Sequence, residues 1–279
     1  MKFYFYTCLA LLWAAPILLQ GQVRVGPVGG ASITRWVPEN NDFAPFYSSN
    51  YRPGYHGGIA ANYWVNKRYS LHTEWLYLYR QKDVRYERNL IKVHDVAKQH
   101  YLAVAALFRV SFHTNIKKSH QEWYVNAGPA LHYWLGGSGR LRSNEQSPYL
   151  EEGSMDYTIR FEAPGEYGST EYITPANRWQ MALYAGGGVM FDLGFRNHIF
   201  IDARTSLGLG KSYFATEAGG DFGLNLYQDN LRSSIASMSL SAGFIRDFNM
   251  TEVLNKGKVK KKKKKNKSLR KNYGGKVSG

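Results

Sequence analysis

The feature that most constrains this chain is an alternation with a period of two residues, which recurs in eight segments between Val23 and Phe248. Successive side chains of a β-strand point to opposite faces, so this period predicts strands. In Trp179–Leu193, for example, one face is apolar and the other carries small or polar residues. The eight predicted strands are Val23–Trp36, Tyr55–Val65, Tyr69–Arg80, His100–Phe112, Trp123–Leu135, Trp179–Leu193, Ile199–Leu209 and Ser234–Phe248.

The connections between these strands alternate between short and long. The short ones are Asn66–Arg68, His113–Gln121 and Gly194–Asn197, and the long ones are Val37–Gly54, Asp83–Gln99, Gly136–Arg178 and Gly210–Ser233. Short turns at one end and long loops at the other are typical of outer-membrane barrels, which have an even strand number and both termini in the periplasm. The sequence therefore predicts an all-β fold over residues 23–248, an eight-stranded antiparallel up-and-down transmembrane β-barrel.

Two groups of residues mark local features of the predicted barrel. Pro27 and Pro129 lie within strands, where proline removes a backbone donor, and we interpret both as bulge sites. Aromatic residues gather near strand ends, as expected for the interfacial girdles of a membrane barrel. They are Tyr77, Tyr79, Trp123, Tyr133, Trp134 and Trp179.

The main alternative is a soluble β-sandwich or lipocalin-like barrel, whose apolar face would point inward. Here the other face is rich in Gly, Ala and Ser and also carries charges such as Arg24. Gly and Ala would be unusual on a water-exposed face, whereas charged groups fit inside an eight-stranded barrel as a packed polar plug. The expected lumenal plug consists of His72, Glu74, Arg109, Asp202 and Arg204. In it Glu74 and Asp202 would neutralise Arg109 and Arg204, because an unpaired buried charge is costly.

The strongly basic character of the chain comes from its C-terminal segment. The net charge is +15, but residues 249–279 alone hold eleven Lys and one Arg against a single acid, Glu252. Such a block repels itself and is expected to be disordered. We expect the run Lys260, Lys261, Lys262, Lys263, Lys264 and Lys265 to contact anionic headgroups, the cell wall or a periplasmic partner. Nucleic acid is not an expected partner, because Tyr273 is the tail's one aromatic residue.

The N-terminal segment, residues 1–22, has the layout of a secretory signal peptide. Lys2 precedes an apolar run from Phe3 to Leu19, and small or polar residues follow. The one cysteine, Cys8, lies in this segment, so the mature chain is expected to lack disulfides, a thiol nucleophile and cysteine-bound zinc. The predicted location is the outer membrane, with outer-membrane lipid as the surroundings.

No pattern points to catalysis, a metal or a cofactor. A hydrolase would need a serine beside His72 or His132 at the outer rim, and no nucleophile-elbow motif is present. The histidines show no metal-binding spacing. The glycines of YAGGGVMF, Tyr184–Phe191, lie inside a strand and are expected to allow curvature. The acidic stretch Gly136–Arg178 is either a binding surface, a lid or a hairpin rising above the membrane.

Three sequence segments resemble PorT-like outer-membrane β-barrels. GYHGGIAANYWVNKRYSLHTEWLYLYR (Gly54–Arg80) is similar to the second and third strands of that family. YVNAGPALHYWLG (Tyr124–Gly136) resembles its aromatic–x–x–Ala–Gly–Pro strand, and IFIDARTSLGLG (Ile199–Gly210) resembles its late strand. The chain departs from the family at the fourth strand, YLAVAALFRV, and in continuing past Phe248.

The resemblance implies an exported barrel of eight strands. The founding member acts in a system that secretes proteins across the outer membrane, which is linked in some bacteria to gliding. By this route we expect a non-enzymatic structural or assembly role, with secretion-system proteins as partners. An enzyme that modifies lipid or peptide at the outer rim and a narrow pore are the alternatives.

Overall fold

The computed structural model describes nine stretches of the chain. They are residues 22–38, 44–66, 68–88, 91–116, 119–144, 153–161, 170–172, 178–209 and 233–249. The predicted signal peptide, apart from Gln22, and the predicted tail with Lys260–Lys265, apart from Asn249 in β11, lie outside the described residues. Both stay predictions.

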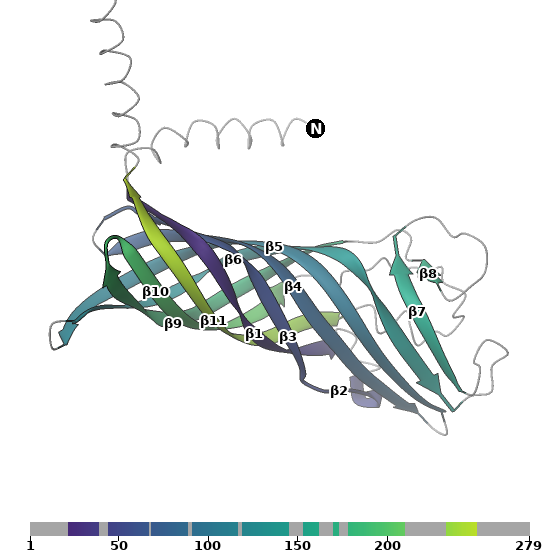
Figure 1. Cartoon of the computed structure of the whole chain (residues 1–279). Helices are drawn as coiled ribbons and strands as arrows, with labels where there is room; N and C mark the ends of the chain where they lie inside the picture. The colour runs from purple at the N-terminus through teal and green to yellow at the C-terminus, as the bar shows by residue number, and fades with distance from the viewer. Residues whose placement is uncertain are drawn as a thin grey trace, which may run out of the picture.

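Eight long strands form one closed ring (Figure 1). They are β1 (Gln22–Pro38), β3 (Arg52–Trp64), β4 (Tyr69–Arg88), β5 (Ile91–Ile116), β6 (Ser119–Ser143), β9 (Trp179–Gly194), β10 (Asn197–Leu209) and β11 (Ser233–Asn249). Each strand pairs antiparallel with the next in this order, and β11 closes the ring on β1. The predicted eight-stranded up-and-down barrel is confirmed.

The ring has two unlike ends. The turns that join β3 to β4, β5 to β6 and β9 to β10 lie at the same end as the start of β1 and the finish of β11, and we call this the turn end (Figure 1). The opposite, loop end carries the short elements. These are η1 (Ala44–Phe46), β2 (Tyr47–Ser49), β7 (Ser154–Arg160) and β8 (Thr170–Tyr172).

At the loop end, β4, β5 and β6 continue well past the other barrel strands as a projecting sheet. β5 has 26 residues and β6 has 25, whereas a tilted strand needs roughly 9–11 residues to cross a membrane. β7 pairs antiparallel with the end of β6 and extends this sheet, and β2 pairs with the end of β4. The long loop predicted over Asp83–Gln99 is therefore wrong, because most of it is strand. Within Gly136–Arg178, residues Ser154–Arg160 form a strand paired with β6, as the hairpin alternative expected.

Barrel side chains face the opposite way from those of a soluble protein. Outward residues such as Trp75, Leu183 and Leu240 are large, apolar and exposed, whereas Glu74 and Asp202 are buried inside. An apolar outer wall with a charged interior suits hydrocarbon outside and a filled lumen within. The soluble lipocalin-like alternative does not fit this arrangement.

Aromatic residues lie on the outer wall near both ends, as predicted, with one correction. Tyr133 and Trp179 pack with ring centroids 4.6 Å apart, and Tyr55 and Tyr79 are 4.7 Å apart, all towards the loop end. Trp134 was predicted in this girdle but is fully buried. Adjacent strand residues face opposite ways, so Tyr133 and Trp134 cannot both face lipid.

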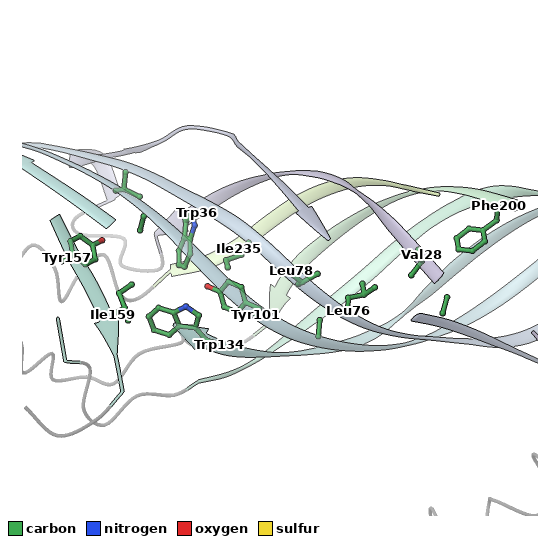
Figure 2. Packing of buried hydrophobic residues seen from close by; sticks show 14 of the residues in the cluster. Val28, Trp36, Leu76, Leu78, Tyr101, Trp134, Tyr157, Ile159, Phe200 and Ile235 are labelled. Atoms are coloured by element: carbon green, nitrogen blue, oxygen red, sulfur yellow. The ribbon is translucent and has the colours of Figure 1, made fainter. Parts of the chain in front are cut away.

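Trp134 instead belongs to an apolar layer inside the loop end (Figure 2). Its ring stacks on Tyr101 with centroids 6.4 Å apart. Trp36 and Ile235 lie in the same layer, and Ile159 of β7 continues it into the projecting sheet (Figure 2). Buried side chains of this layer thus fill the inside of the barrel at the loop end.

The predicted bulges at the prolines are wrong. The pairs Val25↔Arg246 and Val28↔Gly243 keep one register across Pro27, and the register across Pro129 is also unchanged. Proline here interrupts a ladder without adding a residue. A register shift occurs instead where β5 passes from His100 to Tyr101, opposite Gly136 and Trp134. β6 thus holds one extra residue, beside a glycine at φ +136°.

Candidate functional site

A charged network crosses the middle of the lumen. The Arg204 guanidinium donates to both carboxylate oxygens of Glu74, at 2.6 and 2.7 Å, and its Nε donates to Asp202 Oδ1 at 2.5 Å. The second oxygen of Asp202 accepts from Asn126 Nδ2 at 2.9 Å, and His72 Nε2 lies 2.8 Å from Glu74 Oε1. The network therefore joins four of the five expected plug residues.

The strands place these groups on opposite walls. His72 and Glu74 are two residues apart on β4, and Asp202 and Arg204 are two apart on β10, so each pair shares one face of its strand. In the ring, β4 and β10 lie four strands apart, which puts them across the lumen from one another. The Glu74–Arg204 fork therefore bridges the barrel through its centre.

Glycines of the YAGGGVMF segment make room for this network. A Cβ at Gly186 would lie 2.6 Å from Arg204 Cγ and closer still to the backbone oxygen of Ala203, and a Cβ at Gly188 would lie 2.6 Å from the Tyr124 hydroxyl and closer still to the backbone oxygen of Ile201. These contacts are too close for real side chains. The segment was expected to allow curvature, but the contacts show that these two glycines also leave space for large inward side chains.

Arg109, the fifth expected plug residue, is fully buried but lies apart from the carboxylates. Its guanidinium carbon is 3.7 Å from the centre of the Tyr124 ring, and none of its three nitrogens has a hydrogen-bond partner among the described residues. The expected neutralisation of Arg109 by Glu74 or Asp202 is therefore not seen. Arg204 and Asn126 already occupy the oxygens of those two carboxylates.

A second ionic cluster lies towards the turn end. Arg24 bonds Asp247 at 2.6 Å and Glu122 at 3.2 Å, and Ser111 donates to Glu122 at 2.8 Å. His198 Nε2 lies 3.1 Å from the second oxygen of Asp247. The sequence placed Arg24 on the inward face. Glu122 and Asp247 were missed because they lie at the ends of strands, where too few alternating residues remain to assign a face.

One small cavity lies beside the central network. Near Arg204 a cavity of about 30 Å³ remains, roughly the volume of one water molecule. His56 Nε2 lies 2.8 Å from Ser241 Oγ at its edge. A serine beside a histidine is one part of a hydrolase site, but both groups are buried and the cavity is too small for a substrate.

Beyond the rim, the projecting sheet holds its own ion pairs. On its buried side Lys82 pairs with Asp95 at 2.9 Å, and Tyr157 donates to Asp95 at 2.7 Å. Asp83 accepts from Arg52 Nε at 2.6 Å and lies 3.0 Å from His94 Nε2. Burial alone would raise the pKa of Asp83, but the hydrogen bonds from Arg52 and His94 outweigh burial and lower it.

The described residues include histidines close to carboxylates in the lumen, at the turn end and in the projecting sheet. Among them, no group of three or more His, Cys, Asp or Glu side chains is arranged to hold a metal ion. In the same stretches, no helix combines the length and apolar character that crossing a membrane requires.

Comparison with known proteins gives one family match and several structural likenesses. The family model described as "Outer membrane protein beta-barrel domain" matches residues 16–213. OprG of Pseudomonas aeruginosa shares 10% identity, with 82% of this chain and 96% of that one covered and a TM-score of 0.42. Neisserial surface protein A shares 13% identity, with 81% and 97% covered and a TM-score of 0.36.

The attachment invasion locus protein Ail of Yersinia pestis shares 12% identity, with 80% of this chain and 97% of that one covered and a TM-score of 0.31. No curated protein matches the sequence. Likenesses at this level of identity say nothing about the function of this chain.

Proposed function

The chain belongs to the family of outer membrane protein β-barrel domains, and from this premise we propose that it is a filled, non-conducting and non-enzymatic barrel with a structural or assembly role. In this role the barrel is a rigid membrane anchor, and the projecting sheet of β4 to β7 is the part available to other molecules.

The observation that carries the proposal is the Glu74–Arg204 bridge across the lumen. Two opposite walls are joined at the centre by a two-pronged hydrogen-bonded ion pair, and the cavity beside it is about 30 Å³. A channel needs a continuous water path, and an enzyme needs room for a substrate. The filled lumen supports neither alternative.

The orientation of the barrel follows from its ends. In outer-membrane barrels short turns and both termini lie in the periplasm, while long connections lie outside the cell. On this basis the turn end faces the periplasm and the projecting sheet faces outwards. The Lys260–Lys265 run would then lie in the periplasm, close to anionic headgroups, the cell wall or an acidic partner.

A finer form of the proposal is a place in a PorT-type protein secretion system. Its support is the sequence resemblance in Gly54–Arg80, Tyr124–Gly136 and Ile199–Gly210. In this form the barrel is a membrane-anchored component of the secretion machine, and the basic tail tethers it electrostatically to a periplasmic partner.

Two experiments test these levels separately. Purified protein in planar bilayers is expected to give no discrete conductance steps, and stable steps would contradict the filled-barrel proposal.

The proposed secretion role is tested by deleting the gene in its own bacterium. The deletion should leave secreted proteins in the periplasm, and restoring the full chain should reverse this. Unchanged secretion would remove the secretion role and leave the filled barrel intact.

A further inference from the structure

The projecting sheet carries a hollow on its exposed face, which we call the outer groove. Its volume is about 750 Å³. Three strands, β5, β6 and β7, supply its wall. The exposed or half-exposed side chains that line it include His94, Lys98, Ser138, Arg140, Arg142 and Thr158.

The register shift in β6 puts two of these arginines on the exposed face. Before the shift, odd-numbered residues such as Leu131 and Tyr133 face outward. After the extra residue beside Gly136, even-numbered residues face outward, so Arg140 and Arg142 are exposed while Leu141 is buried. A bulge re-aims every side chain that follows it. Without it, Leu141 would face solvent and both arginines would point inward.

Positive charge in the outer groove is only partly compensated. Arg140 forms a two-pronged pair with Asp156, at 2.5 and 2.8 Å, and this hydrogen bonding lowers the pKa of Asp156. Lys98 and Arg142 form no ion pair with any described residue. Arg142 lies directly opposite His94, which in turn lies opposite Arg85. His94 Nε2 already lies 3.0 Å from Asp83 Oδ1, so the positive charge of the groove that forms no ion pair with a described residue is that of Lys98 and Arg142.

The outer groove also lies at a definite height on the outer wall. Along the outward face of β5, apolar Val104 and Leu102 come first, then His100 with its ring against Tyr77 and Tyr79, and then Lys98. Hydrocarbon, aromatic belt and basic side chains thus follow in the order of a membrane's core, interface and headgroups.

The outward face of β6 repeats that order. Leu131 is followed by Tyr133, which packs on Trp179, and Arg140 and Arg142 come after the bulge. Two neighbouring strands thus present basic groups beyond the aromatic belt: Lys98 lies two residues beyond His100, and Arg142 lies nine residues beyond Tyr133 on the same outer wall.

We propose that the outer groove binds the phosphate groups of the phosphorylated glycolipid of the outer leaflet, lipopolysaccharide, with Lys98 and Arg142 as the principal contacts. Arg140 is held by Asp156 at the edge of the groove and contributes less. The proposal rests on the orientation given under the proposed function. A separate experiment tests that orientation. Thr158→Cys should react with an impermeant thiol reagent on intact cells, and this reaction does not depend on glycolipid binding.

The test is a titration of purified barrel in detergent with fluorescent bis-phosphorylated lipid A, the membrane anchor of that glycolipid. The variant Lys98→Gln/Arg142→Gln removes the two unpaired charges. Arg68→Gln/Arg246→Gln is the matched control, because it removes the same charge from exposed positions at the turn end. Asp156→Asn frees Arg140 from its partner. Heat-dependent gel mobility confirms that each variant is a folded barrel.

The wild type should bind phosphorylated lipid A at least about 10-fold more tightly than the same lipid without its phosphates. The groove variant should lose about 10- to 30-fold in affinity, since each basic residue near an anionic surface contributes up to about a fivefold factor. The control should stay within about twofold, and Asp156→Asn should bind more tightly.

Three results would overturn the proposal. One is a groove variant that binds like the wild type, and another is equal binding of the dephosphorylated lipid. The third is full displacement of lipid A by inorganic phosphate, which would show a site for free anions instead of a glycolipid site.

Discussion

The barrel and the projecting sheet are made by the same strands but have opposite outer walls. On β4 the outward residues Leu71, Trp75 and Tyr77 are apolar or aromatic, whereas Arg85 and Glu87, farther along the same face, are charged and exposed. The change comes just beyond the aromatic belt. It indicates that the surroundings of the wall change there from hydrocarbon to water.

The interiors differ in the complementary way. The lumen of the barrel is held by charged groups, with Glu74, Asp202 and Arg204 at its centre. Behind the projecting sheet, Val84, Val93 and Leu141 are buried beside the ion pair Lys82–Asp95. The inward face of one strand can thus be ionic where lipid surrounds the protein, and largely apolar where water surrounds it.

The largest effect is expected from breaking the bridge across the lumen. Glu74→Gln should lower the free energy of unfolding by about 3–5 kcal/mol, because it removes one partner of a buried ion pair and leaves Arg204 with Asp202 as its one carboxylate partner among the described residues. Urea unfolding in lipid vesicles, followed by tryptophan fluorescence, measures this. Arg204→Gln should be similarly costly, and the double variant should cost less than the two losses added together. A loss below about 1 kcal/mol for either variant would contradict the role of the bridge.

A charge on the outer wall should separate the two regions. Leu183→Arg places a cation midway along β9 between Trp179 and Val189, and it should cost about 2–4 kcal/mol. Val96→Arg, on the outward face of the projecting sheet, should change stability by about 0.5 kcal/mol or less. Equal costs at the two positions, in the same vesicle unfolding assay, would remove the distinction between the two walls.

The projecting sheet should respond to acid through Asp83. Because the folded pKa lies below the unfolded value of about 3.9, the ion pair stabilises the sheet fully above that pH and loses this effect as pH falls through the folded pKa. Asp83→Asn should destabilise the sheet by about 1–3 kcal/mol at neutral pH and remove this acid dependence. Amide hydrogen exchange of Val84 and Val96 reports it, with the exchange of barrel amides as the internal control.

Among the lumenal variants, the smallest effect is expected at Arg109. It stacks on Tyr124 and has no carboxylate partner among the described residues, so Arg109→Met should cost about 2 kcal/mol or less. This is below the cost expected for Arg204→Gln. If vesicle unfolding shows that Arg109→Met and Arg204→Gln lose the same free energy of unfolding, the Glu74–Arg204 bridge does not stabilise the barrel more than the Arg109–Tyr124 stack does.

Alternation in the sequence was sufficient to predict the ring, because lipid outside and a packed lumen inside impose a strict two-residue period. It located Glu74, Asp202 and Arg204 on one face. It failed over Asp83–Gln99, where both faces of the hairpin carry charges: Lys82 and Asp95 inside, Arg85 and Lys98 outside. There the period was hidden although the strands continue.

Partner choice in the lumen could not be predicted from the period. Which carboxylate meets which arginine depends on the stagger of strands across the barrel, and this brought Arg204 to Glu74 and left Arg109 against Tyr124. The bulge was missed because Gly136 is one of many glycines in the sequence. Its positive φ angle distinguishes it, and that angle is visible only in the structure. A change in the phase of alternation, from Tyr133 to Arg140, was the signal that could have revealed it.

The most direct test of the account is a nitroxide scan along β5 in lipid vesicles, with single cysteines at successive positions from 94 to 105 in a Cys8→Ser background. At Leu102 and Val104 the label should be reached by oxygen, which dissolves in lipid, and not by a water-soluble nickel reagent. At His94, Val96 and Lys98 the preference should reverse, while Ala103 and Ala105 should be shielded from both. Nickel access along the whole outward face would contradict a lipid-facing barrel wall.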